Sequence, residues 1–217
     1  MFIEVWSDIA CPFCYLGKKR LEKAIQDFEY GDRVEIIWKS YQLDPDLQTE
    51  GTRSIYEYLE EERGYDVQQL QRSNQHLTEK GKELGIEFDF EDIVVANTFH
   101  AHILLQYSRS QGQQLAMKDR LMRAYFTEGK NVGDKETLLD LAEDVGLDRD
   151  ACEKALRSGD HGEQVRMDAY EAHQLGARGV PFFVFNDKYI VRGAQEQAIF
   201  DGALRKAFSE WKRGTGN

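Results

Sequence analysis

The residues best suited to chemistry in this sequence are Cys11 and Cys14, which stand in the segment Cys-Pro-Phe-Cys. Residues 2–6 ahead of them predict a short strand, and the apolar positions from Cys14 onward follow the 3.6-residue period of a helix. With Cys11 as the N-cap, Pro12 takes the first helical position, where its missing N–H costs nothing. The free N–H groups of Phe13 and Cys14, together with the helix dipole, are expected to favour the Cys11 thiolate. Such a thiolate is a nucleophile for disulfide exchange.

The spacing of these cysteines assigns the two sulfurs different roles. Positions i and i+3 are neighbours on a helix, so Cys14 can close a disulfide with Cys11. Cys14 also lies on the apolar stripe above Leu21, which predicts a buried, resolving partner. The alternative is a structural pair or half of a zinc site, but zinc needs four ligands and the chain has only one further cysteine, Cys152. We therefore predict redox chemistry and no metal, with Cys152 as a buried, inert thiol.

A second candidate site is the segment Gly179-Val180-Pro181-Phe182, far along the chain. A proline in a strongly apolar strand is tolerated at its first residue or on an edge, so Pro181 is predicted to open a strand. The isomer of the Val180–Pro181 bond does not follow from the sequence, because only about 5–6% of such bonds are cis in folded proteins. A strand-start proline with no role in chemistry is the alternative.

Strand patterns at both ends of the chain flank a helical block. The predicted order is β-α-β, a run of helices, and α-β-β-α, with strands at residues 34–38 and in a hairpin over 182–191. Residues 1–45 and 160–217 together have the size of one compact domain, so residues 46–159 are predicted to be a helical insertion.

Within and beyond the block, apolar periodicity and capping residues set the helices. Residues 93–107 predict one helix, Asp134 and Asp148 are predicted N-caps, and Gly31 is predicted to close the first helix of the chain. The last helix is expected over residues 196–211, with Ile199, Ala203, Leu204 and Phe208 facing inward.

The composition excludes several partners. The 217 residues contain 28 Lys and Arg against 39 Asp and Glu, a formal charge of −11. Nucleic acids and anionic membranes both need clustered positive charge, so neither is expected as a partner. No apolar run approaches the about 18 residues of a membrane span, and no basic segment precedes an apolar one at the amino terminus. These features and the odd cysteine count predict a cytoplasmic protein.

Together, the two candidate segments resemble the thioredoxin superfamily, and the helical block resembles that of its DsbA branch. The chain is most similar to FrnE-type DsbA-like oxidoreductases, in residues 5–17, in Asn97-Thr98 with Ala101-His102, and in residues 179–185 with Gly193-Ala194-Gln195. This resemblance covers nearly the whole chain. It implies an α/β, thioredoxin-like fold with a large all-helical insertion.

The resemblance also implies roles at the two loci. Cys11 is implied to be the attacking cysteine, Cys14 the resolving one, and Pro181 a cis-proline that faces the disulfide. Val180 is implied to present backbone groups to a substrate strand. The Pro-Phe dipeptide between the cysteines lacks the histidine of periplasmic DsbA, so one source of thiolate stabilisation is missing.

Phe13, Asn97 and His102 are further residues that the resemblance implies at the substrate. For Asn97 and His102 a structural role, such as that of a hydrogen-bonded core histidine, is an equal alternative. His100 and Ile103 stand where relatives commonly carry an acid and an arginine.

The function predicted from these residues is thiol–disulfide exchange with protein or small-molecule thiols. No cofactor is expected beyond the cysteine pair, with glutathione as a candidate redox partner and a monomer or weak homodimer as the assembly. The alternative is a glutathione-dependent isomerase or transferase, like the 2-hydroxychromene-2-carboxylate isomerases and kappa-class transferases, which typically carry serine at the active position. A non-catalytic binding module is a third possibility, which an unperturbed Cys11 would support.

Overall fold

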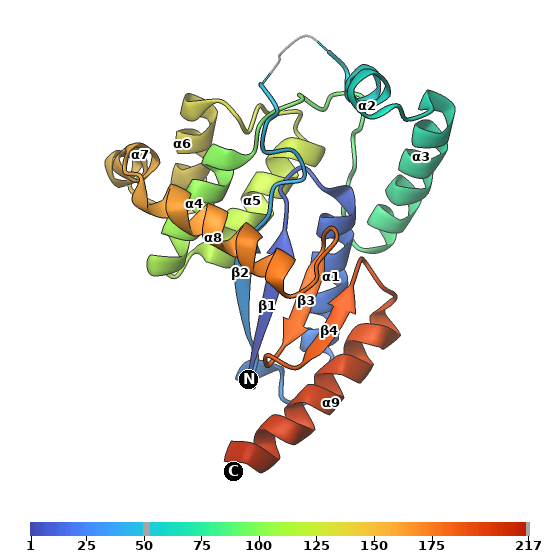
Figure 1. Ribbon diagram of the computed structural model, residues 1–217, viewed down its shortest axis with the longest axis vertical. Coiled ribbons are helices and arrows are strands. Elements are labelled where there is room, and N and C mark those ends of the chain that lie inside the picture. Colours follow the sequence, from blue (N-terminus) through green and yellow to red (C-terminus); the bar gives the residue numbers. More distant parts are fainter. Residues whose placement is uncertain (50–52, 216–217) are drawn as a thin grey trace.

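The computed structural model describes residues 1–49 and 53–215 of the chain. Strands and helices at the two ends of the chain flank a long helical stretch, as predicted (Figure 1). In chain order the elements are β1 (Phe2–Ser7), α1 (Pro12–Gln26), the 3-10 helix η1 (Gly31–Arg33), β2 (Glu35–Ser40), α2 (Ile55–Arg63), α3 (Val67–Glu83), α4 (Phe99–Ser110), α5 (Gln114–Phe126), α6 (Lys135–Asp144), α7 (Arg149–Arg157), α8 (Asp160–Gln174), β3 (Phe182–Phe185), β4 (Tyr189–Arg192) and α9 (Gln197–Thr215).

The four strands form one mixed sheet in the order β2-β1-β3-β4. β1 pairs in parallel with β2 and antiparallel with β3, so that Val5 lies between Trp38 and Phe183. β3 and β4 form the predicted hairpin, whose turn places Asn186 and Asp187 at φ 52° and 58°. Asn and Asp tolerate this left-handed conformation better than most residues, which explains the position of the turn.

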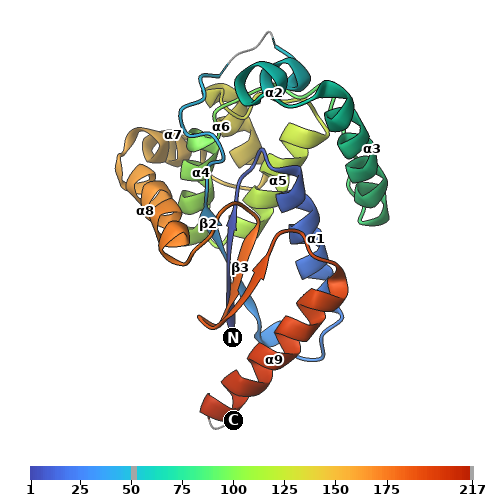
Figure 2. The same cartoon turned by 45° about the vertical axis from the view of Figure 1, so that its right-hand side comes forward.

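Alternation of side chains along the strands gives the sheet two buried faces. Ile3, Val5 and Phe183 belong to the large core, with α1 and α9 packed together on that side. Trp6 and Phe182 face the other way, into a smaller cluster that α8 covers. Figures 1 and 2 show the sheet between these two helical layers. None of the helices in the described residues is both long and apolar enough to cross a membrane.

The helices between β2 and β3 gather over the end of the sheet where β1 leads into α1 (Figure 1). α4 and α5 form their centre, and α6, α7 and α8 pack around α4. Asp134 and Asp148 are N-caps as predicted, because their carboxylates accept the N–H groups of Thr137 and Ala151 at 2.8 Å. The predicted boundary at residue 160 stays a prediction, since α8 packs on both α4 and β2.

Three predictions about the helices are wrong. Helix α1 ends at Gln26, and Gly31 begins η1 instead of closing it. The helix predicted over residues 93–107 begins only at Phe99, because residues 93–98 are irregular chain buried as an apolar segment. In α9 Leu204 and Phe208 are buried as predicted, but Ile199 is half exposed and Phe200 is the buried residue of that turn. The errors at residues 93–98 and at Ile199 arose because an apolar run was assigned the wrong period or phase.

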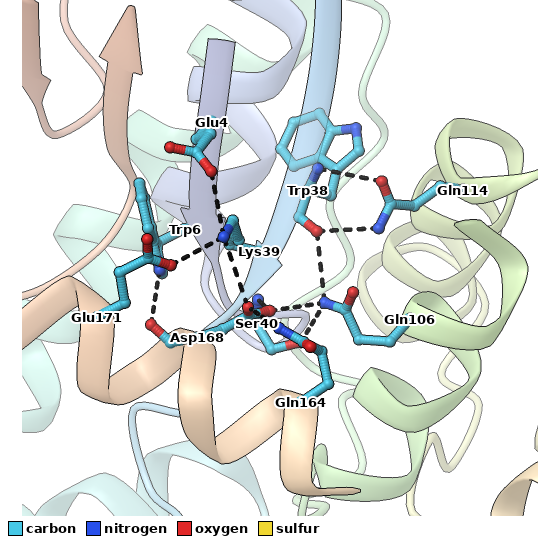
Figure 3. Close-up of polar contacts among 10 residues, drawn as sticks. All are labelled: Glu4, Trp6, Trp38, Lys39, Ser40, Gln106, Gln114, Gln164, Asp168 and Glu171. Carbon is cyan, nitrogen blue, oxygen red and sulfur yellow. Dashed lines mark hydrogen bonds and ion pairs between the residues drawn. The ribbon is translucent and has the colours of Figure 1, made fainter. Parts of the chain in front are cut away.

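Strand β2 lies at the sheet edge, yet side chains from the helices satisfy its outer backbone groups (Figure 3). Gln114 pairs twice with Trp38, accepting its N–H at 3.1 Å and donating to its carbonyl at 2.9 Å. The Ser40 N–H donates to the Asp168 carboxylate at 2.8 Å, and Gln106 donates to the same carboxylate at 2.9 Å. An exposed edge would leave these groups free to pair with another chain. The helical stretch is therefore fastened to the sheet by hydrogen bonds as well as by apolar packing.

The two hydrogen bonds between Gln114 and Trp38 allow a prediction about stability. Gln114→Leu is expected to lower the free energy of unfolding by about 1–3 kcal/mol for each Trp38 backbone group that loses its partner. Urea denaturation of the two proteins measures the difference. The neighbouring Leu115 is 46% exposed, so Leu115→Ala is the control and should change the value by less than about 0.5 kcal/mol. Equal stabilities for Gln114→Leu and the wild type would contradict the prediction.

Candidate active site

The two cysteines begin helix α1 in the geometry that the sequence predicts. Cys11 is the N-cap, with extended φ and ψ of −101° and 111°, and Pro12 is the first helical residue. The Cys14 N–H donates to the Cys11 carbonyl at 3.0 Å. Both side chains are free thiols and nearly inaccessible, Cys11 at 3% and Cys14 at 1% exposure.

The helix start favours the Cys11 thiolate as predicted, but larger effects in the reduced pair oppose it. Interaction with Cys14, burial, and the charge of Asp8 together raise the pKa of Cys11 well above its ordinary value. The Cys14 N–H lowers this pKa, but its effect is smaller. Because two neighbouring thiols influence each other's titration, the pair resists a second negative charge more strongly than a first.

The second candidate segment meets the first one in space. The Val180–Pro181 peptide bond is cis, and the Cys11 Sγ lies 3.8 Å from the Val180 carbonyl oxygen. These residues are 169 positions apart in the chain. The Gly193 N–H donates to the Pro181 carbonyl at 2.8 Å, which ties the segment after β4 to the same loop. Val180 is half-buried and Pro181 buried, so Val180 can offer its backbone beside the sulfur.

Arg20 holds the residues that follow Gly193 against α1. Its buried guanidinium donates to the carbonyls of Ala194 and Gln195 at 2.7 and 3.0 Å. Arg20 belongs to α1, the helix that also carries the cysteines. The segment that holds Pro181 is thus anchored to the cysteine helix.

Gly17, one turn along α1 from Cys14, lets the Pro181 loop approach the helix. A Cβ at this position would lie 3.0 Å from the Pro181 Cγ and 3.0 Å from the Phe183 ring. Both neighbours are buried and cannot move freely. The absence of a side chain at residue 17 therefore sets the distance between the two halves of the site.

Gly17→Ala is expected to destabilise the protein by about 1–3 kcal/mol through overpacking and to slow disulfide exchange by displacing Pro181. Gly202→Ala in α9 is the control, because a Cβ there has no neighbour within 4 Å. That control should gain about 0.5–1 kcal/mol from helix propensity. Thermal unfolding and an exchange assay on both variants give the comparison. An unchanged melting temperature and rate for Gly17→Ala would show that the loop accommodates the methyl group.

A buried carboxylate lies behind the cysteines. Asp8 is 2% exposed, and its two oxygens accept the Leu43 N–H at 2.7 Å and the Thr98 hydroxyl at 2.8 Å. The His102 Nε2 lies 3.2 Å from the same oxygen that Thr98 contacts. Burial alone would raise the pKa of Asp8, but its contacts with His102, Leu43 and Thr98 hold it below the ordinary value. Asp8 is thus a charged anchor between β1, the segment after β2, and α4.

His102 serves this anchor. The side chain is fully buried, and burial lowers its pKa below the ordinary value despite the charge of Asp8. A carboxylate only accepts hydrogen bonds, so the nitrogen facing Asp8 carries the proton of the neutral ring. This contact fits the alternative of a hydrogen-bonded core histidine, and the implied role of His102 at a substrate stays a prediction.

The neutral state of His102 predicts a dependence of stability on pH. The unfolded histidine takes up a proton at about pH 6.5, whereas the folded one resists it. Below this pH the unfolded state therefore binds more protons than the folded state. As the pH is lowered, the free energy of unfolding should fall by up to about 1.4 kcal/mol per pH unit. Urea titrations at several pH values from neutral to mildly acidic measure the slope. His102→Gln should flatten it, whereas His76→Gln, which changes an exposed histidine, should not.

Asn97 and Phe13 have different surroundings in the structure. The Asn97 side chain donates to the carbonyls of Pro45 and Leu47 at 3.1 and 2.8 Å and accepts the Phe99 N–H at 2.8 Å. With both amide atoms engaged in joining these segments, Asn97 is structural here. Phe13 is 48% exposed beside Cys11 and remains available to a substrate.

The sequence did not indicate the burial of Lys118 or the distant partners of Asp8. Lys118 lies in α5 yet is fully buried, and its charge interacts with both cysteines. A lysine in a helix normally reaches solvent, so residue type argued against this position. The residues around Asp8 suggest no more than a turn cap, whereas its partner Thr98 lies 90 residues away in the chain. No local pattern links such distant groups.

Comparisons with known proteins identify the family of this chain. The family model of the DSBA-like thioredoxin domain matches residues 2–205. The crystal structure of a probable DsbA oxidoreductase, SCO1869 from Streptomyces coelicolor, superposes with a TM-score of 0.91 at 36% identity, covering 97% of this chain and 91% of that one. YwbO of Bacillus subtilis (strain 168) is 29% identical over 213 residues, 93% of this chain and 94% of YwbO.

A third likeness concerns the fold alone. The structure of a 2-hydroxychromene-2-carboxylate isomerase superposes with a TM-score of 0.72 at 19% identity, covering 100% of this chain and 98% of that one. The predicted thioredoxin-like fold with a helical insertion is confirmed by the family match and by SCO1869. The chain belongs to the DSBA-like thioredoxin domain family, whose members include thiol–disulfide oxidoreductases.

Proposed function

We propose that this protein is a thiol–disulfide oxidoreductase that works through Cys11 and Cys14. One observation carries the proposal: Cys11 is the N-cap of the helix that carries Cys14, and its Sγ lies 3.8 Å from the Val180 carbonyl oxygen. A sulfur so placed can be reached by a second chain that pairs with the backbone of Val180. The exposed Phe13 ring lies beside it as an apolar contact for that chain.

The reaction proceeds in two exchanges. The Cys11 thiolate attacks a substrate disulfide, so that one S–S bond breaks, a mixed disulfide forms at Cys11, and the departing thiolate takes a proton from solvent. Cys14 then loses its proton and attacks the Cys11 sulfur, which closes the internal disulfide and releases the second substrate thiolate. Two electrons pass from the cysteine pair to the substrate. The reverse sequence oxidises a substrate dithiol.

Equilibration with mixtures of reduced and oxidised glutathione tests the proposal. After acid quenching and alkylation, mass spectrometry should show Cys11 and Cys14 leaving the free-thiol state together in a two-electron transition, with Cys152 free throughout. The midpoint gives the reduction potential, in which about 30 mV corresponds to 1.4 kcal/mol and separates a reductant from an oxidant. Two cysteines that stay free at every ratio would overturn the proposal.

The alternative function is a glutathione-dependent isomerase or transferase. The fold shared with the 2-hydroxychromene-2-carboxylate isomerase structure is the observation in its favour. A cysteine pair at the helix start favours redox chemistry instead. Cys14→Ser separates the two, because conjugation or isomerisation would survive this change, whereas disulfide exchange would stop at the mixed disulfide.

The setting of the activity belongs to the same proposal. We place it in the cytoplasm, with protein or small-molecule thiols as substrates and glutathione as a redox partner. The chain has three cysteines, an odd number that fits a compartment where thiols outside a catalytic pair stay reduced. The proposal keeps two further predictions made from the sequence. The protein is most similar to FrnE-type oxidoreductases, and it is a monomer or a weak homodimer.

A further inference from the structure

A lysine from the helical insertion lies buried behind the cysteine pair. Lys118 of α5 is 0% exposed, and its Nζ donates to the Ser7 carbonyl at 3.4 Å. The ammonium also lies 5.6 Å from the centre of the Trp38 ring. Across residues 1–49 and 53–215, no carboxylate comes within ion-pair distance of it, so one long hydrogen bond and a ring face are its partners.

Lys18 shows how unusual this arrangement is within the same molecule. Lys18 is equally buried, but its Nζ lies 2.6 Å from Glu22 and 2.6 Å from Asp119. An ammonium taken out of water is costly unless an anion accompanies it. Lys18 has two such anions, whereas Lys118 has none in contact. Burial accordingly lowers the pKa of Lys118 to about 8, against the raising effects of Cys14 and Asp8.

The titratable groups that influence the charge of Lys118 come from three parts of the fold. They are Cys14 and Lys18 of α1 with its N-cap Cys11, Asp8 after β1, and His102 of α4. His102 is neutral, and Lys18 repels Lys118. The charge of Asp8 is already met by Leu43, Thr98 and His102.

The cysteine pair is therefore the remaining source of negative charge. Cys14 has the largest electrostatic influence on Lys118, ahead of Asp8, and a thiolate there favours the ammonium. Attraction is mutual, so the ammonium favours the thiolate equally. Closure of the disulfide removes this charge altogether.

We propose that Lys118 is the counter-ion of the cysteine pair: its ammonium balances the single thiolate of the reduced pair and gives up a proton when the disulfide closes. The inference rests on the proposed function. The reduced site holds one thiolate, one thiol and an ammonium, and the oxidised site a disulfide and a neutral amine. The difference is two electrons and two protons, which together convert a substrate disulfide into two thiols. In both redox states the cysteine pair and Lys118 together thus carry no net charge.

Titration of wild-type Lys118 in both redox states tests the inference. The protein is labelled with ¹³C-lysine, and the Lys118 resonance is assigned from its loss in Lys118→Met and its persistence in Lys18→Met. The apparent pKa of Lys118 should be lower by about one pH unit or more in the disulfide form, because a nearby opposite charge has been removed. Identical titrations in the two forms would overturn the inference.

A second measurement uses the reactivity of the cysteines. Lys118→Met should raise the midpoint of the pH profile of iodoacetamide alkylation by about one pH unit, which makes alkylation about ten-fold slower below the midpoint. Lys18→Met is the matched control, since Glu22 and Asp119 are 24% and 40% exposed and water can replace the lysine. Its midpoint should not rise. An unmoved midpoint in a folded Lys118→Met protein would also overturn the inference.

The two proposals fail in different ways. If the wild-type cysteines never form a disulfide with glutathione, the proposed function is lost. If the cysteines form the disulfide but the pKa of Lys118 is the same in the reduced and oxidised proteins, only the counter-ion role is lost.

Discussion

Cys11→Ser is expected to reduce disulfide exchange to the rate of the uncatalysed reaction. A serine hydroxyl stays protonated at neutral pH and is a far weaker nucleophile than a thiolate, so no mixed disulfide can form at residue 11. Reduction of insulin and oxidation of a dithiol peptide are the two assays, because together they cover both directions of electron flow. Wild-type rates in the Cys11→Ser protein would refute the proposed function.

Cys14→Ser should give a different result from the same assays. The first exchange at Cys11 can still occur, but without the second sulfur the mixed disulfide persists and accumulates. Non-reducing mass spectrometry of the variant with glutathione should show one adduct on Cys11. Cys152→Ala is the control, because Cys152 is fully buried and burial raises its pKa to about 11. This variant should keep the wild-type exchange rate.

Asp8→Ala is expected to lower the free energy of unfolding by about 1–3 kcal/mol for each buried donor that loses its acceptor. The change leaves the Leu43 N–H, the Thr98 hydroxyl and His102 without their acceptor. The loss should be largest near neutral pH. The folded pKa of Asp8 is depressed, so the wild-type advantage is present above the ordinary Asp value of about 4 and disappears as the pH falls through the folded pKa.

Urea denaturation across the acid range measures the effect of Asp8→Ala. Asp140→Ala provides the comparison: Asp140 is 67% exposed, and its partner Arg149 keeps contacts with Glu136 and Glu143. A surface ion pair of this kind contributes at most about 1 kcal/mol. If both variants lost the same amount, Asp8 would be an ordinary turn cap, as its sequence context alone suggests.

Local sequence was sufficient for much of the fold. The strands at both ends, the hairpin at Asn186, and the caps at Asp134 and Asp148 follow from residues within a few positions of each other. The hydrogen bonds of the hairpin turn and of the two caps close over the same short distance, so the neighbouring residue types decide them. The start of α1 at Pro12, with Cys11 as its cap, belongs to this class.

The errors arose where burial came from packing. Residues 93–98 carry an apolar pattern that fits a helix, but they are irregular chain held against the core. Apolar residues are buried in either conformation, and the period over a short run cannot separate the two. The predicted direction of the net pKa shift of Cys11 was wrong for a related reason. The helix start acts as predicted, but burial and contact with Cys14 have larger effects.

Local patterns in the amino-acid sequence predict that two cysteines stand at a helix start, where disulfide chemistry is possible, and that a proline segment opens a distant strand. Only the tertiary structure brought the Val180 carbonyl to 3.8 Å from the Cys11 sulfur and buried Asp8, His102 and Lys118 behind the pair. A helix cap depends on neighbours in the chain, so the sequence encodes it locally. The charge and accessibility of a thiol depend on which surfaces cover it, and those surfaces come from β1, α4, α5 and the segment before β3, which meet only when the chain is folded.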